Sequence, residues 1–329
     1  MSNATLEANI KSAPGIPELM PIPLATLSAS HSLGVDLYLK TGPKAPPTLY
    51  RDRKVPVTAD ELERLAANNI RVGYIPADQG DDYQQYLREN VETYLYNETI
   101  PVSRRYEFLS ETAREVLRDA FRTNKPNVIL TAADQLGDKM VDLMSQQDDV
   151  ASDLFYILRH DYHTFTHCFN VASYSLALAR ALGISDPAEL KLISVGGLVH
   201  DLGKLRISAA ILTKPGPLTP EERAIIQRHP RDGFVELCRR NDLTWGQLMM
   251  VYQHHERIGG KGYPVGVGGE EIHTLGRLCA VVDVFEAMTS NRPYRKSLPI
   301  PFVLEHLNKQ AGTTFDQEMV KCWTATMQP

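Results

Sequence analysis

The stretch Leu198-Val199-His200-Asp201-Leu202-Gly203-Lys204 decides the fold expected of this 329-residue chain. An apolar helical run leads directly into a neighbouring imidazole and carboxylate. Adjacent residues on a helix point about 100° apart, so both side chains reach one site only if it lies in the angle between them, near the helix end. A carboxylate there can bridge two metal ions through its two oxygens. The pattern predicts a helical domain built around a metal site.

Histidines are concentrated around this stretch. Seven of the ten lie between His160 and His255, and the last two of them form the doublet His254-His255. Further candidate ligands lie on separate expected helices: His167, His229 and Asp283. Imidazoles and carboxylates gathered without a cysteine pattern predict a nitrogen-and-oxygen metal site. For any single histidine, burial with satisfied hydrogen bonds remains the alternative.

The composition is that of an ordinary globular protein. Hydrophobic residues make up 43%, charged residues 23%, and the formal net charge is -5. The chain has no apolar run long enough for a signal peptide or a membrane span, so we expect a cytoplasmic protein without membrane insertion. The four cysteines form no Cys-x-x-Cys pair and are expected to be reduced thiols. Without a basic run, extended nucleic acid is not expected as a partner, whereas a small anionic substrate remains open.

The pattern along the chain predicts a mainly α protein with a small α/β domain at its N-terminal end. Residues 1–24 are proline-containing and aperiodic, and are expected to form a flexible arm. Residues 25–100 are expected to form the α/β domain, with a hairpin between Val35 and Tyr50, a helix capped at Thr58, a strand over 70–75 and a helix over 81–95. Its position suggests a regulatory or dimerisation role as a hypothesis.

Helical periodicity takes over from Ser103. Residues 101–149 are expected to form a helical connector, and residues 150–329 an all-helical domain. Asp186-Pro187-Ala188-Glu189 and Thr219-Pro220-Glu221-Glu222 both predict helix starts, the first helix ending at His200 and the second carrying His229. Further helices are expected over 106–123, 132–145, 167–182, 244–256 and 275–289.

Six segments give the sequence a specific resemblance, which covers residues 150–329. They are Tyr162-His163-Thr164-Phe165-Thr166-His167, His200-Asp201-Leu202-Gly203-Lys204, His229-Pro230-x-x-Gly233, the run from His254 to Pro264 that includes Gly260-x-Gly262-Tyr263-Pro264, the run from Asp283 to Arg295, and Ala311-Gly312-Thr313-Thr314-Phe315-Asp316. The sequence resembles the HD-GYP family, the cyclic di-GMP phosphodiesterase branch of the HD phosphohydrolases. This resemblance implies an HD-type helical fold and a part in bacterial second-messenger signalling.

The resemblance also implies the ligand set. It assigns metal ligation to His167, His200, Asp201, His229, His254, His255 and Asp283. The expected cofactors are two divalent ions, iron or manganese, with Asp201 bridging them. Some members hold a third metal with a glutamate four residues before the first histidine ligand. His163 occupies that place here, so a third ion is expected only if His163 coordinates.

The implied chemistry is attack on phosphorus by a hydroxide that bridges the two metals, since a binuclear site can lower the pKa of a shared water and clamp the attacking and leaving oxygens. Asp201 and Lys204 are the expected catalytic residues, with Lys204 contacting phosphate oxygens or assisting the departing 3′-oxygen. Glu256 is expected to orient a ligand histidine. The expected substrate contacts are Tyr263, Arg292, Arg295 and Lys261. A turn role for Tyr263 and a solvent-exposed position for the cations are the alternatives.

The function expected from the resemblance is hydrolysis of cyclic di-GMP to pGpG and onward to GMP. One departure matters, because the family usually carries an aspartate where this chain has Gly259. The missing carboxylate leaves two alternatives open: a weak or inactive cyclic di-GMP sensor or interaction protein, and a phosphodiesterase for another cyclic dinucleotide. A homodimer and signalling protein partners are further candidates.

Overall fold

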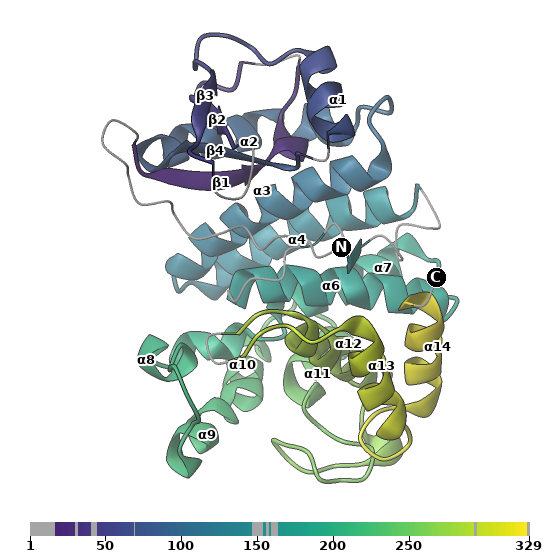
Figure 1. Ribbon diagram of the computed structural model, residues 1–329. Coiled ribbons are helices and arrows are strands. Elements are labelled where there is room, and N and C mark those ends of the chain that lie inside the picture. Colours follow the sequence, from purple (N-terminus) through teal and green to yellow (C-terminus); the bar gives the residue numbers. More distant parts are fainter. Residues whose placement is uncertain are drawn as a thin grey trace. The chain divides into compact units, whose positions relative to one another are not determined.

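The computed structural model describes residues 17–29, 32–40, 45–68, 70–146, 154–155, 158, 164–292 and 295–327. The chain divides into two compact units, residues 1–115 and 116–329 (Figure 1). Helix α3 (Val102–Arg122) contains this division, which therefore falls inside the stretch expected to be a connector. Among the described residues, no helix has both the length and the apolar character needed to cross a membrane.

The first unit contains a four-stranded antiparallel sheet with the order β1-β4-β2-β3. The strands are β1 (Leu19–Pro23), β2 (Leu37–Leu39), β3 (Thr48–Arg51) and β4 (Val72–Pro76). The predicted hairpin is confirmed as β2 and β3, with a register irregularity between Leu37 and Tyr38. Helix α1 (Ala59–Ala67) begins with the predicted capping box at Thr58, and helix α2 (Gly80–Leu95) follows β4.

The prediction of a flexible arm over residues 1–24 is wrong for residues 19–24, which are ordered. Leu19–Pro23 is strand β1, paired along its length with β4, and the side chains of Leu19 and Ile22 are buried. The prolines at 21 and 23 obscured this strand, but β1 lies at the edge of the sheet, where a residue without an N–H group is tolerated. Residues 1–16 of the expected arm lie outside the described residues.

Tyrosine hydroxyls of α2 hold the segment that follows β1. The hydroxyl of Tyr83 lies 2.6 Å from that of Thr26, and the hydroxyl of Tyr94 donates to the Ala25 carbonyl. Tyr86 accepts from the Ser28 backbone N–H at 2.9 Å. Because buried hydroxyls need partners, these bonds fix α2 against the chain between η1 (Leu24–Thr26) and residue 28.

The second unit is all helical in its described residues. Its longer helices are α4 (Pro126–Met144), α6 (Thr164–Ala181), α7 (Pro187–Val199), α10 (His229–Leu237), α11 (Trp245–Gln253), α12 (Thr274–Thr289), α13 (Ile300–Lys309) and α14 (Gln317–Met327). Helix α6 packs against α7, α12 and α14, and α7 packs against α4 and α11. Tyr174, Phe285 and Trp323 meet edge to face in the core. The expectation of a mainly α protein with a small α/β part is confirmed.

The helix expected to run from Thr219 through His229 is instead two helices, α9 (Pro220–Ile226) and α10. The capping box at Thr219 is present as predicted. The break has a local cause, because the ring of Pro230 would clash with the carbonyl of Ile226 if the helix continued. As a result, His229 becomes the first residue of α10.

Gly197 sets the distance between α6 and α7. A Cβ atom at this position would lie 2.7 Å from the Cα of Ala172, closer than real contacts allow. Only glycine permits this approach. Because His200 follows three residues later, the same contact fixes where the end of α7 meets α6.

We predict that Gly197→Ala destabilises the helical unit. The gain in helix propensity of about 1 kcal/mol is outweighed by overpacking, which costs roughly 1–3 kcal/mol and here involves backbone that cannot rotate away. The matched control is Gly276→Ala on α12, where the added Cβ lies 3.1 Å from the Gln253 Cβ and no closer than 3.3 Å to backbone, at the Met249 carbonyl oxygen. Thermal unfolding should show a lower midpoint for Gly197→Ala than for the control. An equal or higher midpoint would contradict the packing argument.

Candidate metal centre

Five segments of the helical unit deliver the candidate ligands to one place. His167 lies in α6, and His200 and Asp201 follow the last residue of α7. His229 begins α10, His254 and His255 directly follow α11, and Asp283 lies in α12. His200, His229 and His254 are fully buried. All seven residues that the sequence predicted as ligands therefore gather in the core of one unit.

Asp201 lies in the middle of this cluster, and its two carboxylate oxygens face different histidines. Its Oδ1 lies 3.1 Å from the Nε2 of His229 and 3.9 Å from that of His254. Its Oδ2 lies 3.3 Å from the Nε2 of His167 and 3.6 Å from that of His200. The carboxylate thus separates two pairs of imidazoles.

The remaining ligands complete two groups on either side of Asp201. His167, His200 and Asp283 form one set of donor atoms, and His229, His254 and His255 form another, the donors of each set lying within 4.8 Å of one another. Asp283 adds a second link, because its Oδ1 lies 3.2 Å from His167 and its Oδ2 lies 3.9 Å from His255. Each group offers the three side-chain donors that a divalent cation needs.

Main-chain carbonyls orient three of the imidazoles. The Nδ1 atoms of His200 and His229 lie 2.7 Å from the carbonyls of Gly197 and Ile226, and that of His254 lies 2.9 Å from the carbonyl of Met250. A carbonyl only accepts hydrogen bonds, so each Nδ1 carries the proton. The Nε2 lone pairs are therefore left facing the cluster, as in a metal-ligating histidine.

Several of these inward-facing atoms lie where a bound cation would stabilise them. The Nε2 atoms of His229 and His254 lie 3.1 Å apart. Two lone pairs at this distance repel each other unless a positive charge lies between or beside them. Among the described residues, the Nε2 atoms of His167 and His200 and the Oδ1 of Asp201 are buried without a hydrogen-bond partner. The residues present therefore fit bound divalent metal.

The charges around His254 and Asp201 favour the same state. Burial, together with the neighbouring His200 and His229, lowers the pKa of His254 to about 3. Burial alone raises the pKa of Asp201, but Lys204 and the surrounding imidazoles hold it well below its usual value. At neutral pH His254 is thus neutral and Asp201 ionised, which is the protonation state that ligands adopt.

Glu286 is a functional residue that the sequence reasoning did not single out. Its buried carboxylate lies 2.5 Å from the Nδ1 of His167, and it also accepts hydrogen bonds from Asn170 at 3.2 Å and Ser290 at 2.6 Å. A carboxylate that accepts a hydrogen bond from Nδ1 fixes the orientation of the ring and makes Nε2 a stronger electron-pair donor to a metal ion. The available signal was its position three residues after Asp283, on the same face of α12.

Lys204 contacts the Oδ2 of Asp201 from the first turn after α7. Burial lowers its pKa, but the Asp201 carboxylate more than compensates and leaves the pKa raised. Lys204 is therefore a charged ammonium at the edge of the cluster. Its position contradicts the alternative of a solvent-exposed lysine, since only a fifth of its side chain is exposed.

The two predicted arginines differ in their surroundings. The guanidinium of Arg292 lies 3.5 Å from Glu286 and is thereby close to His167. That of Arg295 donates to the main-chain carbonyls of Ala287, Met288 and Lys296. These bonds hold Arg295 at the C-terminal end of α12, and its contact with substrate stays a prediction.

The loop after His255 is held by contacts that the sequence did not reveal. Glu256 was expected to orient a ligand histidine, but its carboxylate accepts from the backbone N–H groups of Val265 and Gly266 at 2.8–3.1 Å. The backbone N–H of Gly259 donates to Thr313 at 2.8 Å, and that of Ile258 donates to Thr314. The loop is thus fixed from within and from the closing segment at 311–316.

Tyr263 of this loop packs beside the metal-ligand cluster, with its ring centroid 4.7 Å from that of His255. Lys261 is exposed to solvent. His163, the candidate third-metal ligand, and His160 both lie outside the described residues.

The comparisons with known proteins agree with this arrangement. The sequence profile of the HD domain family matches residues 131–319. A cyclic di-GMP phosphodiesterase of Pseudomonas aeruginosa is 40% identical over 41% of this chain and 33% of its own length. A cyclic di-GMP phosphodiesterase response regulator of Xanthomonas campestris is 38% identical over 44% of this chain and 38% of its own. The chain thus spans little more than a third of the length of these relatives.

Two other comparisons bear on substrate and fold. A 3′3′-cGAMP-specific phosphodiesterase of Vibrio cholerae is 40% identical over 45% of this chain and 34% of its own length. The solved structure of an HDGYP protein from Bdellovibrio bacteriovorus covers 94% of this chain and all of its own, with a TM-score of 0.67 at 20% sequence identity. At this identity the likeness concerns the fold alone.

We predict that Glu286→Ala weakens metal binding about 10- to 100-fold, because His167 loses the acceptor that orients its ring. Metal content after equilibrium dialysis measures this without any enzyme assay. Glu256→Ala is the matched control, since it removes a buried carboxylate that contacts loop backbone and no imidazole. Equal metal retention by the two variants would contradict the role of Glu286.

Proposed function

Because this chain belongs to the HD-domain family and carries its HD-GYP motifs, we propose that residues 150–329 are a metal-dependent phosphodiesterase that hydrolyses cyclic di-GMP. The observation that carries the proposal is the position of Asp201 between two groups of inward-facing donors. We propose pGpG as the first product and GMP as a further one. The proposed activity lies in the helical unit, and a regulatory role for the α/β part remains a prediction.

Two divalent ions would occupy the two groups. His167, His200 and Asp283 would hold one, His229, His254 and His255 the other, and Asp201 would contact both. Imidazole and carboxylate donors suit iron or manganese, which we propose as the resident metals. When bound, such ions supply a nucleophile at neutral pH and stabilise negative charge on the phosphate.

The chain contributes fixed cations beside the metals. Lys204 is held by Asp201 and stays protonated, so its ammonium can bind a non-bridging phosphate oxygen or stabilise the departing 3′-oxygen. Arg292 offers a planar guanidinium that matches two phosphate oxygens. Both cations are already positioned by carboxylates that contact ligand histidines, so little ordering is needed when substrate binds.

The loop supplies the proposed contacts with the base. The Tyr263 ring, held against His255, offers an aromatic surface for guanine stacking. Lys261 lies two residues before it and is a weaker candidate for a phosphate contact. Glu256 and Thr313 hold the loop at both ends, so its shape is set before a ligand arrives.

The order of this loop favours the enzyme over the inactive sensor. The sensor alternative rests on Gly259, which lacks the usual carboxylate. In this structure Glu256 and the closing segment supply hydrogen bonds that order the loop. A second candidate function, hydrolysis of another cyclic dinucleotide, is favoured by the similarity to 3′3′-cGAMP-specific enzymes.

We predict that the metal-loaded protein converts cyclic di-GMP to pGpG, measured by nucleotide chromatography under reducing conditions with manganese or ferrous iron. Asp201→Ala should reduce this rate to background, because both metal groups lose their shared carboxylate. The control Glu305→Ala removes an exposed carboxylate on α13 and should retain full activity. Faster turnover of 3′3′-cGAMP than of cyclic di-GMP would favour the second candidate. No product from either nucleotide would contradict both.

We predict that Gly259→Asp does not increase kcat/KM. Its Cβ would lie 3.1 Å from the Thr313 carbonyl oxygen, and a carboxylate nearby would be repelled by that oxygen. By contrast, Glu256→Ala should lower kcat/KM by at least about tenfold, since even one lost charge-assisted hydrogen bond is worth roughly 1.5–3 kcal/mol and Glu256 accepts from two backbone N–H groups. Steady-state kinetics with both variants distinguishes these effects. A large gain for Gly259→Asp would show that the missing carboxylate limits this enzyme.

A further inference from the structure

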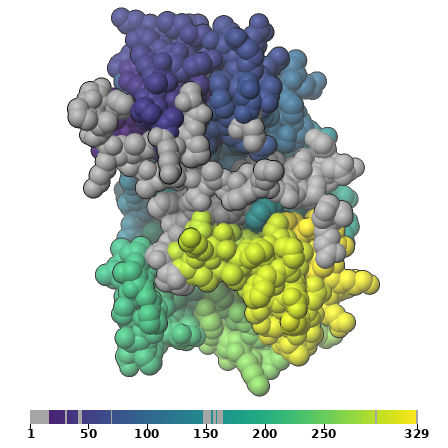
Figure 2. Space-filling view, viewed as in Figure 1, coloured from purple at the N-terminus to yellow at the C-terminus, as the bar shows by residue number. Residues whose placement is uncertain are grey.

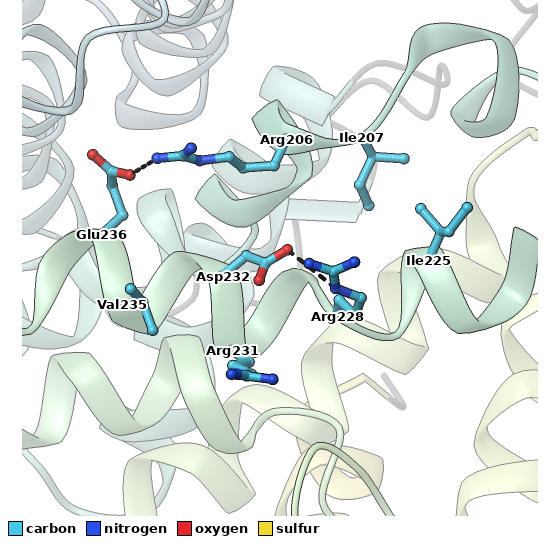
Figure 3. Close-up of a pocket in the computed structure, with 8 residues that line it drawn as sticks. All are labelled: Arg206, Ile207, Ile225, Arg228, Arg231, Asp232, Val235 and Glu236. Atoms are coloured by element: carbon cyan, nitrogen blue, oxygen red, sulfur yellow. Dashed lines mark hydrogen bonds and ion pairs between the residues drawn. The ribbon is translucent and has the colours of Figure 1, made fainter.

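A basic cavity lies away from the metal centre, on the surface of the helical unit. It has a volume of about 440 Å³ and is formed by the end of η3 (Leu202–Arg206), by α9 and by α10 (Figure 3). Its lining includes three arginines, Arg206, Arg228 and Arg231. None of the candidate metal ligands lines it, so the proposed catalysis does not account for it.

A second cavity of about 460 Å³ adjoins the first, because Glu236 lines both. Its lining adds Lys125, Val128 and Arg240. We call the two together the arginine groove. Their linings follow one another along the chain, with Arg228 to Glu236 in the first and Glu236 and Arg240 in the second, so the groove suits an elongated occupant better than a compact one.

The groove is positively charged in a chain that is negative overall. Its lining contains five cations and two acidic residues, whereas the whole chain has a formal net charge of -5. The cations are Arg206, Arg228, Arg231, Arg240 and Lys125, and the acidic residues are Asp232 and Glu236. Arg206 is paired with Glu236, and Arg228 lies 3.9 Å from Asp232. About two thirds of each of these arginine side chains is nevertheless exposed. Guanidinium groups held this way remain available to further carboxylates.

Exposed apolar side chains lie among these charges. Val235 is 60% exposed, Val128 41% and Ile225 39%. The helices beside them are also unusual, because neither α8 (Ala209–Leu212) nor α9 buries a single residue within the chain. In Figure 2 the green segment that contains α8, α9 and α10 forms a lobe at the side of the helical unit. Exposed apolar area bordered by polar groups is typical of an interaction surface.

The spacing of the key residues follows one face of α10. Arg228, the N-cap residue of α10, is followed by Arg231 and Val235 at spacings of three and four residues, so the three lie along one side of the helix. A second helix that lies along this side would meet alternating cationic and apolar positions.

We propose that the arginine groove docks an acidic amphipathic helix from a protein partner. Its glutamates or aspartates would pair with Arg206, Arg228 and Arg231, and its apolar side chains would cover Ile225 and Val235. The proposal rests on charge complementarity and on the joined cavities, and it does not depend on the proposed enzymatic function.

The groove is connected to the metal centre by two chain segments that they share. Arg206 ends the turn that contains Lys204 and follows Asp201, and Arg228 directly precedes His229. These two segments are packed so closely that a Cβ on Gly203 would lie 2.0 Å from the carbonyl oxygen of His229. A partner bound to Arg206 and Arg228 therefore contacts two segments, one carrying Asp201 and Lys204 and the other carrying the proposed metal ligand His229.

The test measures binding of a fluorescent peptide made of glutamate and leucine, with the leucines at helical spacing, to the full metal-loaded chain by fluorescence anisotropy. Arg228→Glu combined with Arg231→Glu should weaken binding at least about tenfold, because the new glutamates repel the acidic peptide and a tenfold loss corresponds to only about 1.4 kcal/mol. Val235→Asp should weaken it as well. Lys309→Glu combined with Lys321→Glu is the matched control, because it makes the same change in net charge on exposed positions of α13 and α14.

The proposal is supported if the wild type and the control bind the peptide, while both groove variants lose binding and keep the wild-type melting temperature. Absence of wild-type binding, or equal weakening by the control pair, would overturn it. Equal binding of a peptide with the same composition but scrambled leucine spacing would also overturn it, because attraction would then be electrostatic alone. The readout is binding, so a failure of the proposed phosphodiesterase activity leaves this result unaffected.

Discussion

The interaction on which this structure depends is the contact of one buried carboxylate, that of Asp201, with imidazoles on both sides. A buried charge is costly unless it is paired, and here Lys204 contacts the carboxylate. Histidines from α6, the end of α7, α10 and the end of α11 surround it at 3.1–3.9 Å, where a bound cation would stabilise their donor atoms and the carboxylate together. The helices must therefore converge at this point for the core to be stable. The close approach at Gly197 and the tight contact at Gly203 are packing features that make this convergence possible.

The imidazoles are oriented by two different means. His200, His229 and His254 each use a carbonyl three or four residues earlier in the chain, so their orientation is set by local helix geometry. His167 instead uses the Glu286 carboxylate on another helix. Its orientation therefore depends on the packing of α6 against α12, and the same carboxylate lies near Arg292, the proposed phosphate contact. Metal binding and substrate binding would thus share one buried anion.

The surroundings of the centre fall into two regions with different properties. The loop after His255 is fixed by Glu256 and by the backbone of residues 313–314, which suits a pre-shaped surface for a nucleotide. On α9 and α10 lies the arginine groove, where charge and apolar side chains remain exposed. The loop is ordered by internal hydrogen bonds, whereas the arginine groove leaves arginine and apolar side chains exposed, where the proposed partner would bind.

The sequence by itself determined the helical class, the family resemblance and all seven candidate ligands, because these depend on residue type, local periodicity and spacing. It also predicted the capping boxes at Thr58 and Thr219, which are local hydrogen bonds. Only the tertiary structure decided that Glu286 supports His167, that Glu256 holds a loop and that Arg295 closes a helix, because each partner lies on another turn or another element. Strand β1 was missed for the same reason: two prolines argue against a strand locally, and only its place at the sheet edge makes them acceptable.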